Sequence, residues 1–229
     1  EKEVVIDEIF AYLDSPSDQI YDDFESQVFQ NHPLGNPILG TKESVKNLDK
    51  EAIGNYLNRL YKAENMCFSS IGNISVSQLK RKLEKHFKDL STIELIQKRN
   101  PFINSKAKKS SHNKGTHQTH CIMGKATYGA NSSKRIPLIL LNNILGGPAM
   151  NSILNLKIRE KYGFTYNIES NYAIYSDSGL ISIYLASDPK YMSKCLKAVN
   201  RELRKLREKA LSPNRLHLAK QQLKGHIAL

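Results

Sequence analysis

The sequence predicts an α+β fold, because strand-like segments come in hairpin order while helical segments follow one another in runs. Apolar residues recur at helical spacing through most of residues 1–31. Residues 116–128 alternate toward the pattern of a half-buried strand. Two further strand-like segments, 166–175 and 179–185, flank Ser176-Asp177-Ser178 and are expected to form an antiparallel hairpin.

The first part of the chain is expected to be mainly helical. Ser15-Pro16-Ser17 should divide residues 1–31 into two helices, and the breakers from His32 to Pro37 should form a loop. Residues 66–71 are predicted to be a strand. Three N-cap residues predict three more helices: Thr41 before a short turn, Asp49 before 51–61, and Ser75 before a helix to 87. Their apolar faces should hold Ile53, Tyr56, Leu57, Leu60, Leu79, Leu83 and Phe87.

A polar, basic segment is predicted to separate two domains. Residues 98–115 are rich in Lys, Ser and Asn and are interpreted as a linker. The first domain is then 1–97 and the second 116–229. Both ends of the chain fall inside helical patterns, so both are interpreted as cut points, which leaves one partial and one nearly complete domain.

The second domain is predicted to contain four helices. Two of them, over 132–145 and 151–161, are separated by the breakers Gly146-Gly147-Pro148. The other two are long and begin at Asp188-Pro189 and Ser212-Pro213, where proline follows an N-cap residue.

Composition leaves several classes of partner open. The formal net charge of +12 suits nucleic acid, anionic membranes or acidic substrates. The basic residues gather in 97–115 and 188–224 without the interleaved aromatics of single-strand binders, which favours a basic linker and solvated helix faces. No run of eighteen apolar residues is present, so no membrane span is expected.

Cysteines and histidines give no strong metal signal. The cysteines are odd in number and far apart, which argues against a disulfide framework or zinc ribbon and leaves the compartment open: Cys67, Cys121 and Cys195. The histidines His112, His117 and His120 lie close in sequence. However, His117 and His120 are three apart in a predicted strand and should face opposite sides.

Two pairs of residues carry candidate chemistry. Glu1 and Glu8 are seven residues apart, so they share one helical stripe and lie about 10 Å apart along the axis. Their carboxylates either meet a cation, metal or donor, or belong to a solvated helix start. Arg159 and Tyr166 are both able to donate hydrogen bonds to one developing oxyanion. Otherwise Arg159 caps a helix and Tyr166 lies in the sheet.

Five motifs in order resemble the pitrilysin/insulinase (M16) zinc metallopeptidases, which include the mitochondrial processing peptidases. The motifs are EKEVVIDE (1–8), HPLGNPILGT (32–41), QTHCIMG (118–124), LGG (145–147) and REKYGFTY (159–166). The resemblance covers nearly the whole chain and implies two-layer domains of antiparallel sheet and packed helices. Pro148 departs from the family, in which small residues usually follow LGG.

The resemblance implies a role for four residues. Glu8 corresponds to a zinc ligand, and Glu1 to a second glutamate that orients a ligand histidine. Arg159 and Tyr166 correspond to the pair that polarises the scissile carbonyl. The family's HxxEH motif, with two zinc-binding histidines and the general-base glutamate, is absent from this sequence. The resemblance therefore implies a fragment that holds no catalytic zinc by itself and is inactive alone.

In this family two similar halves form a clamshell around peptides or unfolded polypeptides. The chain has matches to Glu8 and to Arg159 with Tyr166, so it is expected to pair as a homodimer or with a second M16 half. The predicted function is that of part of a zinc-dependent endopeptidase. The alternatives are a non-catalytic M16-fold partner or structural subunit, and a basic nucleic-acid-binding protein.

Overall fold

The computed structural model describes residues 1–90, 102 and 106–228. The chain divides into two units. The first comprises Glu1, Glu3–Gly40 and Pro101–Leu229, and the second Lys2 and Thr41–Asn100. These units are groups of residues that contact one another. The domains predicted from the sequence, 1–97 and 116–229, stay a prediction.

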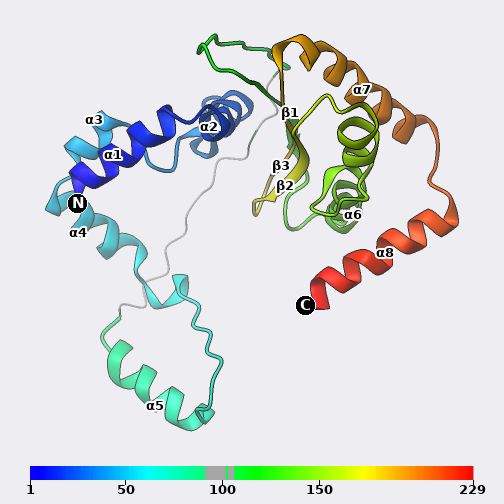
Figure 1. Cartoon of the computed structure of the whole chain (residues 1–229). Helices are drawn as coiled ribbons and strands as arrows, with labels where there is room; N and C mark the ends of the chain where they lie inside the picture. The colour runs from blue at the N-terminus through cyan, green and yellow to red at the C-terminus, as the bar shows by residue number, and fades with distance from the viewer. Residues whose placement is uncertain (91–101, 103–105, 229) are drawn as a thin grey trace. The chain divides into compact units, whose positions relative to one another are not determined.

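The first unit holds a three-stranded antiparallel sheet with helices on both faces (Figure 1). The strand order is β1-β3-β2, so the predicted hairpin is present and β3 is the central strand. The elements are α1 (Lys2–Leu13), α2 (Pro16–Val28), η1 (Pro33–Gly35), β1 (Thr119–Thr127), α6 (Arg135–Gly146), η3 (Asn155–Glu160), β2 (Asn167–Ile174), β3 (Gly179–Ser187), α7 (Pro189–Glu208) and α8 (Pro213–Ala228). The α+β class with antiparallel pairing is confirmed.

The main core lies on the sheet face that packs against α6, η3 and α7. Side chains alternate between the two faces of a strand, so Ile183 and Leu185 of β3 point to this side together with Ile168 of β2. Cys195 and Val199 of α7 pack against them and are fully buried. This side supplies most of the apolar burial of the unit.

Gly146 allows α6 to lie close to β2. A Cβ at this position would lie 2.7 Å from the amide nitrogen of Ser170, which is closer than a real methyl group approaches backbone. The Ser170 hydroxyl donates to the carbonyl of Asn142 at 3.0 Å, and the Asn142 amide donates to the Ser170 carbonyl at 3.2 Å. The LGG motif therefore has a packing role here.

The other sheet face packs against α2 and contains a polar cluster within apolar surroundings. Tyr21 of α2 stacks on Tyr184 of β3 with ring centroids 5.3 Å apart. The Tyr184 hydroxyl shares a hydrogen bond of 2.8 Å with His120 Nδ1, and the Tyr21 hydroxyl donates to Glu169 at 2.9 Å. Glu169 lies opposite Tyr184 in the strand register. These contacts fix α2 on the sheet.

The second unit contains the predicted short helices, α3 (Lys42–Asn47), α4 (Lys50–Leu60), η2 (Ala63–Asn65) and α5 (Val76–Phe87). Thr41 and Ser44 form a capping box, Asp49 accepts from Ala52 N at 2.7 Å, and Ser75 accepts from Gln78 N at 3.3 Å. The three predicted N-caps are confirmed. Backbone donors at these helix starts thus find local partners without a larger core.

One expectation for the second unit is wrong. Residues 66–71 form no strand, and their side chains Phe68 and Ile71 are exposed. A strand needs a neighbour for its backbone groups, and no described segment pairs with this one. The apolar faces of α4 and α5 are also largely uncovered, since Tyr56 and Phe87 are about half exposed. Helical periodicity predicted the faces but not a partner for them.

The predicted linker, 98–115, falls partly on residues 98–101 and 103–105, which lie outside the described residues. Its described residues, 102 and 106–115, belong to no helix or strand. Ser110 donates to the Gln27 side chain of α2 at 2.7 Å, and Gln27 donates to the Lys108 carbonyl at 3.1 Å. This part of the segment is therefore hydrogen-bonded to α2.

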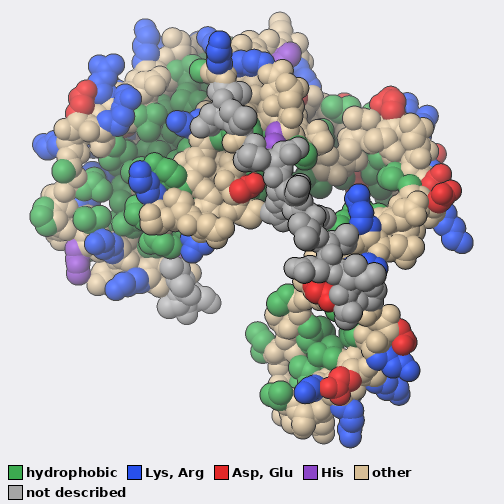
Figure 2. Space-filling view, turned by 180° about the vertical axis from the view of Figure 1, so that it is seen from behind, with side chains coloured by type: hydrophobic (Ala, Val, Ile, Leu, Met, Phe, Trp, Pro, Cys, Tyr) green, Lys and Arg blue, Asp and Glu red, His purple; other side chains and the backbone are tan. Residues whose placement is uncertain are grey.

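None of the described helices has the length and apolarity that crossing a membrane requires. Lys and Arg side chains lie on much of the visible surface, and acidic ones are fewer (Figure 2).

Replacing Tyr184 by Phe should destabilise the first unit. The substitution removes the hydroxyl partner of His120 at a buried position, and a lost buried hydrogen bond costs about 1 kcal/mol. Denaturant unfolding should show a lower midpoint. Tyr12→Phe, at a half-exposed position of α1, is the control and should leave the midpoint unchanged. Equal midpoints for the two variants would contradict the role of the cluster.

The same cluster should make stability fall at alkaline pH. Burial raises the pKa of Tyr21, and the hydrogen bond to Glu169 and its charge raise it further. Because the folded pKa lies above the unfolded value of about 10, the stabilisation is complete below that pH and is lost as pH rises beyond it. Unfolding free energies across this range should fall less steeply for Tyr21→Phe than for the unchanged protein. Parallel curves would contradict this prediction.

Candidate functional site

Arg159 lies on the π-helical turn η3, which forms the middle of the helix predicted over 151–161. Leu154 and Ile158 are fully buried and hold this turn on the sheet. Arg159 points outward, where its Nε lies 3.6 Å from the carboxylate of Glu160 and the side chain is 43% exposed. Single π-turns within helices occur often at functional sites, because they displace one side chain from the regular helical face.

Gly163 reverses the chain between Arg159 and Tyr166. Its φ is +61°, a left-handed conformation, and its N–H donates to the Arg159 carbonyl at 2.9 Å. This is the conformation that ends many helices, and glycine adopts it without the strain that a Cβ introduces. The left-handed backbone conformation at residue 163 thus explains why REKYGFTY has glycine at this position.

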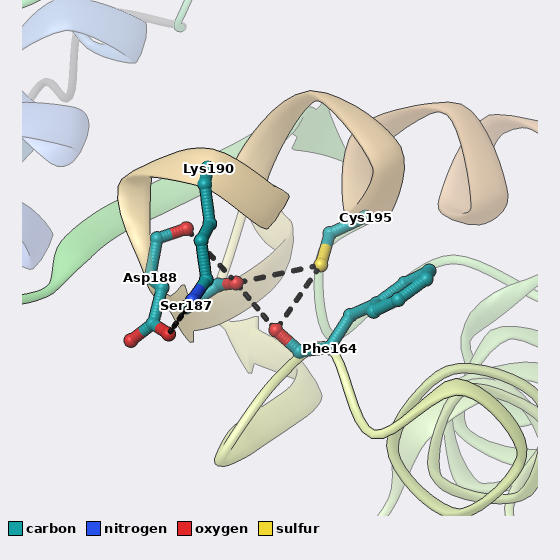
Figure 3. Close-up of polar contacts among 5 residues, drawn as sticks. All are labelled: Phe164, Ser187, Asp188, Lys190 and Cys195. Carbon is teal, nitrogen blue, oxygen red and sulfur yellow. Dashed lines mark hydrogen bonds and ion pairs between the residues drawn. The ribbon is translucent and has the colours of Figure 1, made fainter.

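A polar network fixes the connection that follows Gly163 (Figure 3). The buried Ser187 hydroxyl donates to the Phe164 carbonyl, and the Cys195 thiol lies 3.6 Å from the same oxygen. The Thr165 hydroxyl donates to the Ala186 carbonyl at 2.6 Å. Burial raises the pKa of Cys195, which keeps the thiol protonated and suits a structural rather than a nucleophilic role.

Tyr166 is presented by this fixed connection at the start of β2. Its N–H donates to the Ala186 carbonyl at 3.2 Å, while its side chain is 66% exposed. Arg159 and Tyr166 therefore come from the two ends of one short, well-anchored connection, and both project polar groups from it. Neither residue lines the hollow beside Leu48 and Tyr56 or the hollow beside Tyr162 and Phe164.

Glu1 and Glu8 lie on α1, where both are exposed. Glu1 is the N-cap residue, without a capping bond from its side chain. Ile6 is the buried residue of this helix, whereas the carboxylate of Glu8 is exposed. Throughout the described part of the chain, no three His, Cys, Asp or Glu side chains gather as a potential metal site.

The sequence did not point to a second group of residues beside this connection. Tyr162, Phe164 and Tyr191 stack on one another, and cations of α7 lie over their rings. The regular spacing of Lys and Arg along α7 was a visible signal for the basic part. The stack could not be predicted from the sequence, because it joins Tyr191 of α7 to Tyr162 and Phe164, which lie well before α7 in the chain.

Comparisons of the sequence and structure with known proteins all point to one family, peptidase M16. A family model described as the peptidase M16 inactive domain matches residues 47–223. A protein of Bacillus subtilis named "uncharacterized zinc protease YmxG" is 31% identical over 231 residues. The match covers 100% of this chain and 55% of the relative, so the chain spans about half the length of the curated relatives it matches.

Two solved structures share the fold at low sequence identity. The peptidase M16 inactive domain from Pseudomonas fluorescens has a TM-score of 0.91 at 19% identity, covering 98% of this chain and 54% of that one. A chain of complex III2 from Candida albicans has a TM-score of 0.86 at 19% identity, covering 99% and 56%.

Replacing Gly163 by Ala should destabilise the protein by about 1 kcal/mol, since φ is positive while nothing lies within 4 Å of the added methyl. Gly225→Ala is the matched control, because it lies within α8 with equal space and should be neutral or stabilising. Denaturant midpoints measure both. A Gly163→Ala variant as stable as Gly225→Ala would contradict the conformational role of Gly163.

Proposed function

The chain belongs to the peptidase M16 family, and on this basis we propose that its protein is a zinc-dependent endopeptidase acting on peptides or unfolded polypeptides. The observation that supports this most is the presentation of Arg159 and Tyr166 by one anchored connection, with both side chains exposed. The names of relatives as zinc proteases agree with it. The resemblance gives the same two residues as the carbonyl-polarising pair.

Arg159 and Tyr166 would act as hydrogen-bond donors to the scissile carbonyl oxygen. A guanidinium is always charged and a phenol is neutral at physiological pH, so both are donors throughout that range. Donors stabilise the oxygen most as negative charge develops on it, and a pre-positioned pair does so without reorganisation. The hydrogen bonds of Phe164, Thr165 and Tyr166 to β3 would supply this positioning.

The described residues do not by themselves fit a zinc ion. A catalytic zinc takes three protein ligands and a water, whereas this part of the chain brings no three metal-binding side chains together. We propose that Glu8 supplies one carboxylate and that donors outside this sequence supply the others. Glu1, at the start of the same helix, would orient a ligand histidine.

The proposed assembly is a clamshell of two M16 halves. The chain would pair with a copy of itself or with a similar half, which would bring Glu8 of one into the same chamber as Arg159 and Tyr166 of the other. Each half would combine the proposed domains 1–97 and 116–229 across the linker 98–115. The proposal includes neither a nucleic-acid nor a membrane partner.

A second candidate is a non-catalytic partner or structural subunit. Two findings favour it: the matching family model is described as an inactive domain, and the same fold occurs in a chain of complex III2. It would require neither bound zinc nor a working Arg159. The two candidates thus differ in metal content and in peptide hydrolysis.

Metal analysis and hydrolysis of a quenched fluorescent peptide, with and without chelator, test the proposal on the complete protein. Glu8→Gln should lower the bound zinc, while Glu3→Gln, exposed on the same helix, should not. Arg159→Ala should keep the zinc and reduce kcat by about 10²-fold, as the loss of one oxyanion donor does. Lys157→Ala, which removes another exposed cation of the same turn, is its control.

Absence of hydrolysis, together with no zinc in the unchanged protein, would favour the non-catalytic subunit. Hydrolysis that the chelator does not reduce would reject a zinc-dependent peptidase. Zinc retained in Glu8→Gln would reject Glu8 as a ligand. A kcat unchanged by Arg159→Ala would reject the oxyanion role.

A further inference from the structure

The helix α7 carries five cations along one side, which we call the basic stripe. They are spaced four, three, four and four residues apart, so they follow the helical repeat. Over fifteen residues the stripe extends about 22 Å. Its members are all exposed: Lys190, Lys194, Lys197, Arg201 and Lys205.

A stack of three aromatic rings, the aromatic column, supports the stripe. Tyr162 and Phe164 are 5.3 Å apart and nearly parallel, at 9°, and Phe164 and Tyr191 are 5.1 Å apart at 20°. Lys194 Nζ lies 5.6 Å from the ring centres of both Phe164 and Tyr191, and the Arg201 guanidinium 5.6 Å from Tyr162. Cations held over ring faces are ordered by the negative face of the ring.

The aromatic column is anchored from behind. The Phe164 carbonyl accepts from Ser187 and lies 3.6 Å from the Cys195 thiol, which ties the middle ring to β3 and α7 (Figure 3). Arg201 donates to the Tyr162 hydroxyl at 3.0 Å. The aromatic column and the basic stripe together border a shallow hollow of about 220 Å³. It is lined by Tyr162, Phe164, Lys194, Lys197, Ala198 and Arg201.

Charge on the stripe is balanced at its ends but not at its centre. Lys190 lies 3.9 Å from the carboxylate of Asp188, and the buried Glu202 pairs with Arg201 at 3.3 Å and Lys205 at 2.9 Å. Within the described structure, no carboxylate lies within 4 Å of Lys194 or Lys197. Like charges so close together lower their repulsion by binding an anion.

We propose that the basic stripe binds an acidic segment of a polypeptide in extended conformation. Cations four residues apart on a helix are separated by about 6 Å along its axis, and alternate side chains of an extended chain by about 6.6 Å. Carboxylates at every second residue would therefore match the pairs that lie four residues apart, Lys190 with Lys194 and Lys197 with Arg201. Lys194 and Lys197 lie about 4.5 Å apart along the axis, and their long side chains would spread to meet two such carboxylates.

The geometry of the rings favours a peptide over single-stranded nucleic acid. Nucleic-acid binders present free aromatic faces on which bases stack. Here Phe164 has a ring on each side, and cations lie over the faces of Tyr162 and Tyr191. The proposal concerns binding alone and does not rest on peptide hydrolysis.

Fluorescence anisotropy on the full chain tests the proposal with a dye-labelled peptide that alternates Glu and Ser. A peptide with Gln in place of Glu is its neutral match. Changing Lys194 and Lys197 together to Gln should weaken binding about tenfold, as expected for the loss of two ion pairs. Changing Lys220 and Lys224 of α8 to Gln removes the same charge from exposed positions and should change affinity less than about twofold.

Tight binding of the Glu peptide, weak binding of the Gln peptide and selective loss in the stripe variant would support the proposal. Equal weakening by both double variants would overturn it, because net charge alone would then explain the binding. It would also be overturned if oligothymidylate or phosphatidylserine vesicles bound more tightly than the Glu peptide and lost that binding in the stripe variant. Circular dichroism verifies that both variants are folded.

Discussion

The hydrogen bond from the buried Ser187 hydroxyl to the Phe164 carbonyl is the contact on which the arrangement of both proposed functional surfaces depends. It joins the end of the central strand to residues 163–165, which belong to no helix or strand. The Ala186 carbonyl beside it accepts from both the Thr165 hydroxyl and the Tyr166 N–H, so backbone carbonyls on both sides of the junction have partners. Removing such a partner is expensive, so the connection keeps one conformation.

One fixed connection thereby serves two surfaces. Its ends carry Arg159 and Tyr166, which the proposed peptidase activity uses. Its middle contributes Tyr162 and Phe164 to the aromatic column beside the basic stripe. Because the same backbone anchors hold both, a substitution at Ser187 would disturb both, whereas Arg159 and Lys194 are exposed and can be changed separately.

Interactions between residues close in sequence made much of the fold predictable. Thr41, Asp49 and Ser75 satisfy helix donors within a few residues, and the hairpin after β2 is set by its own alternation and turn. Residues 66–71 show the limit of this reasoning. Their composition favours a strand, but a strand exists only beside another, and sequence pattern does not reveal whether a neighbour is present.

The candidate site likewise has features that the sequence predicts and features that only the folded structure reveals. The turn at Gly163 could be predicted, because glycine commonly ends a helix in the left-handed conformation found here. The spacing of Lys190, Lys194 and Lys197 also places them on one side of a helix by the helical repeat alone. The aromatic column requires Phe164 to meet Tyr191 across the whole β2–β3 hairpin, and only the packing of α7 on the sheet brings this about. An exposed lysine face usually means solvation. The three stacked rings beside this one, with the backbone of the middle residue, Phe164, hydrogen-bonded to the buried Ser187, distinguish it from an ordinary solvated helix face.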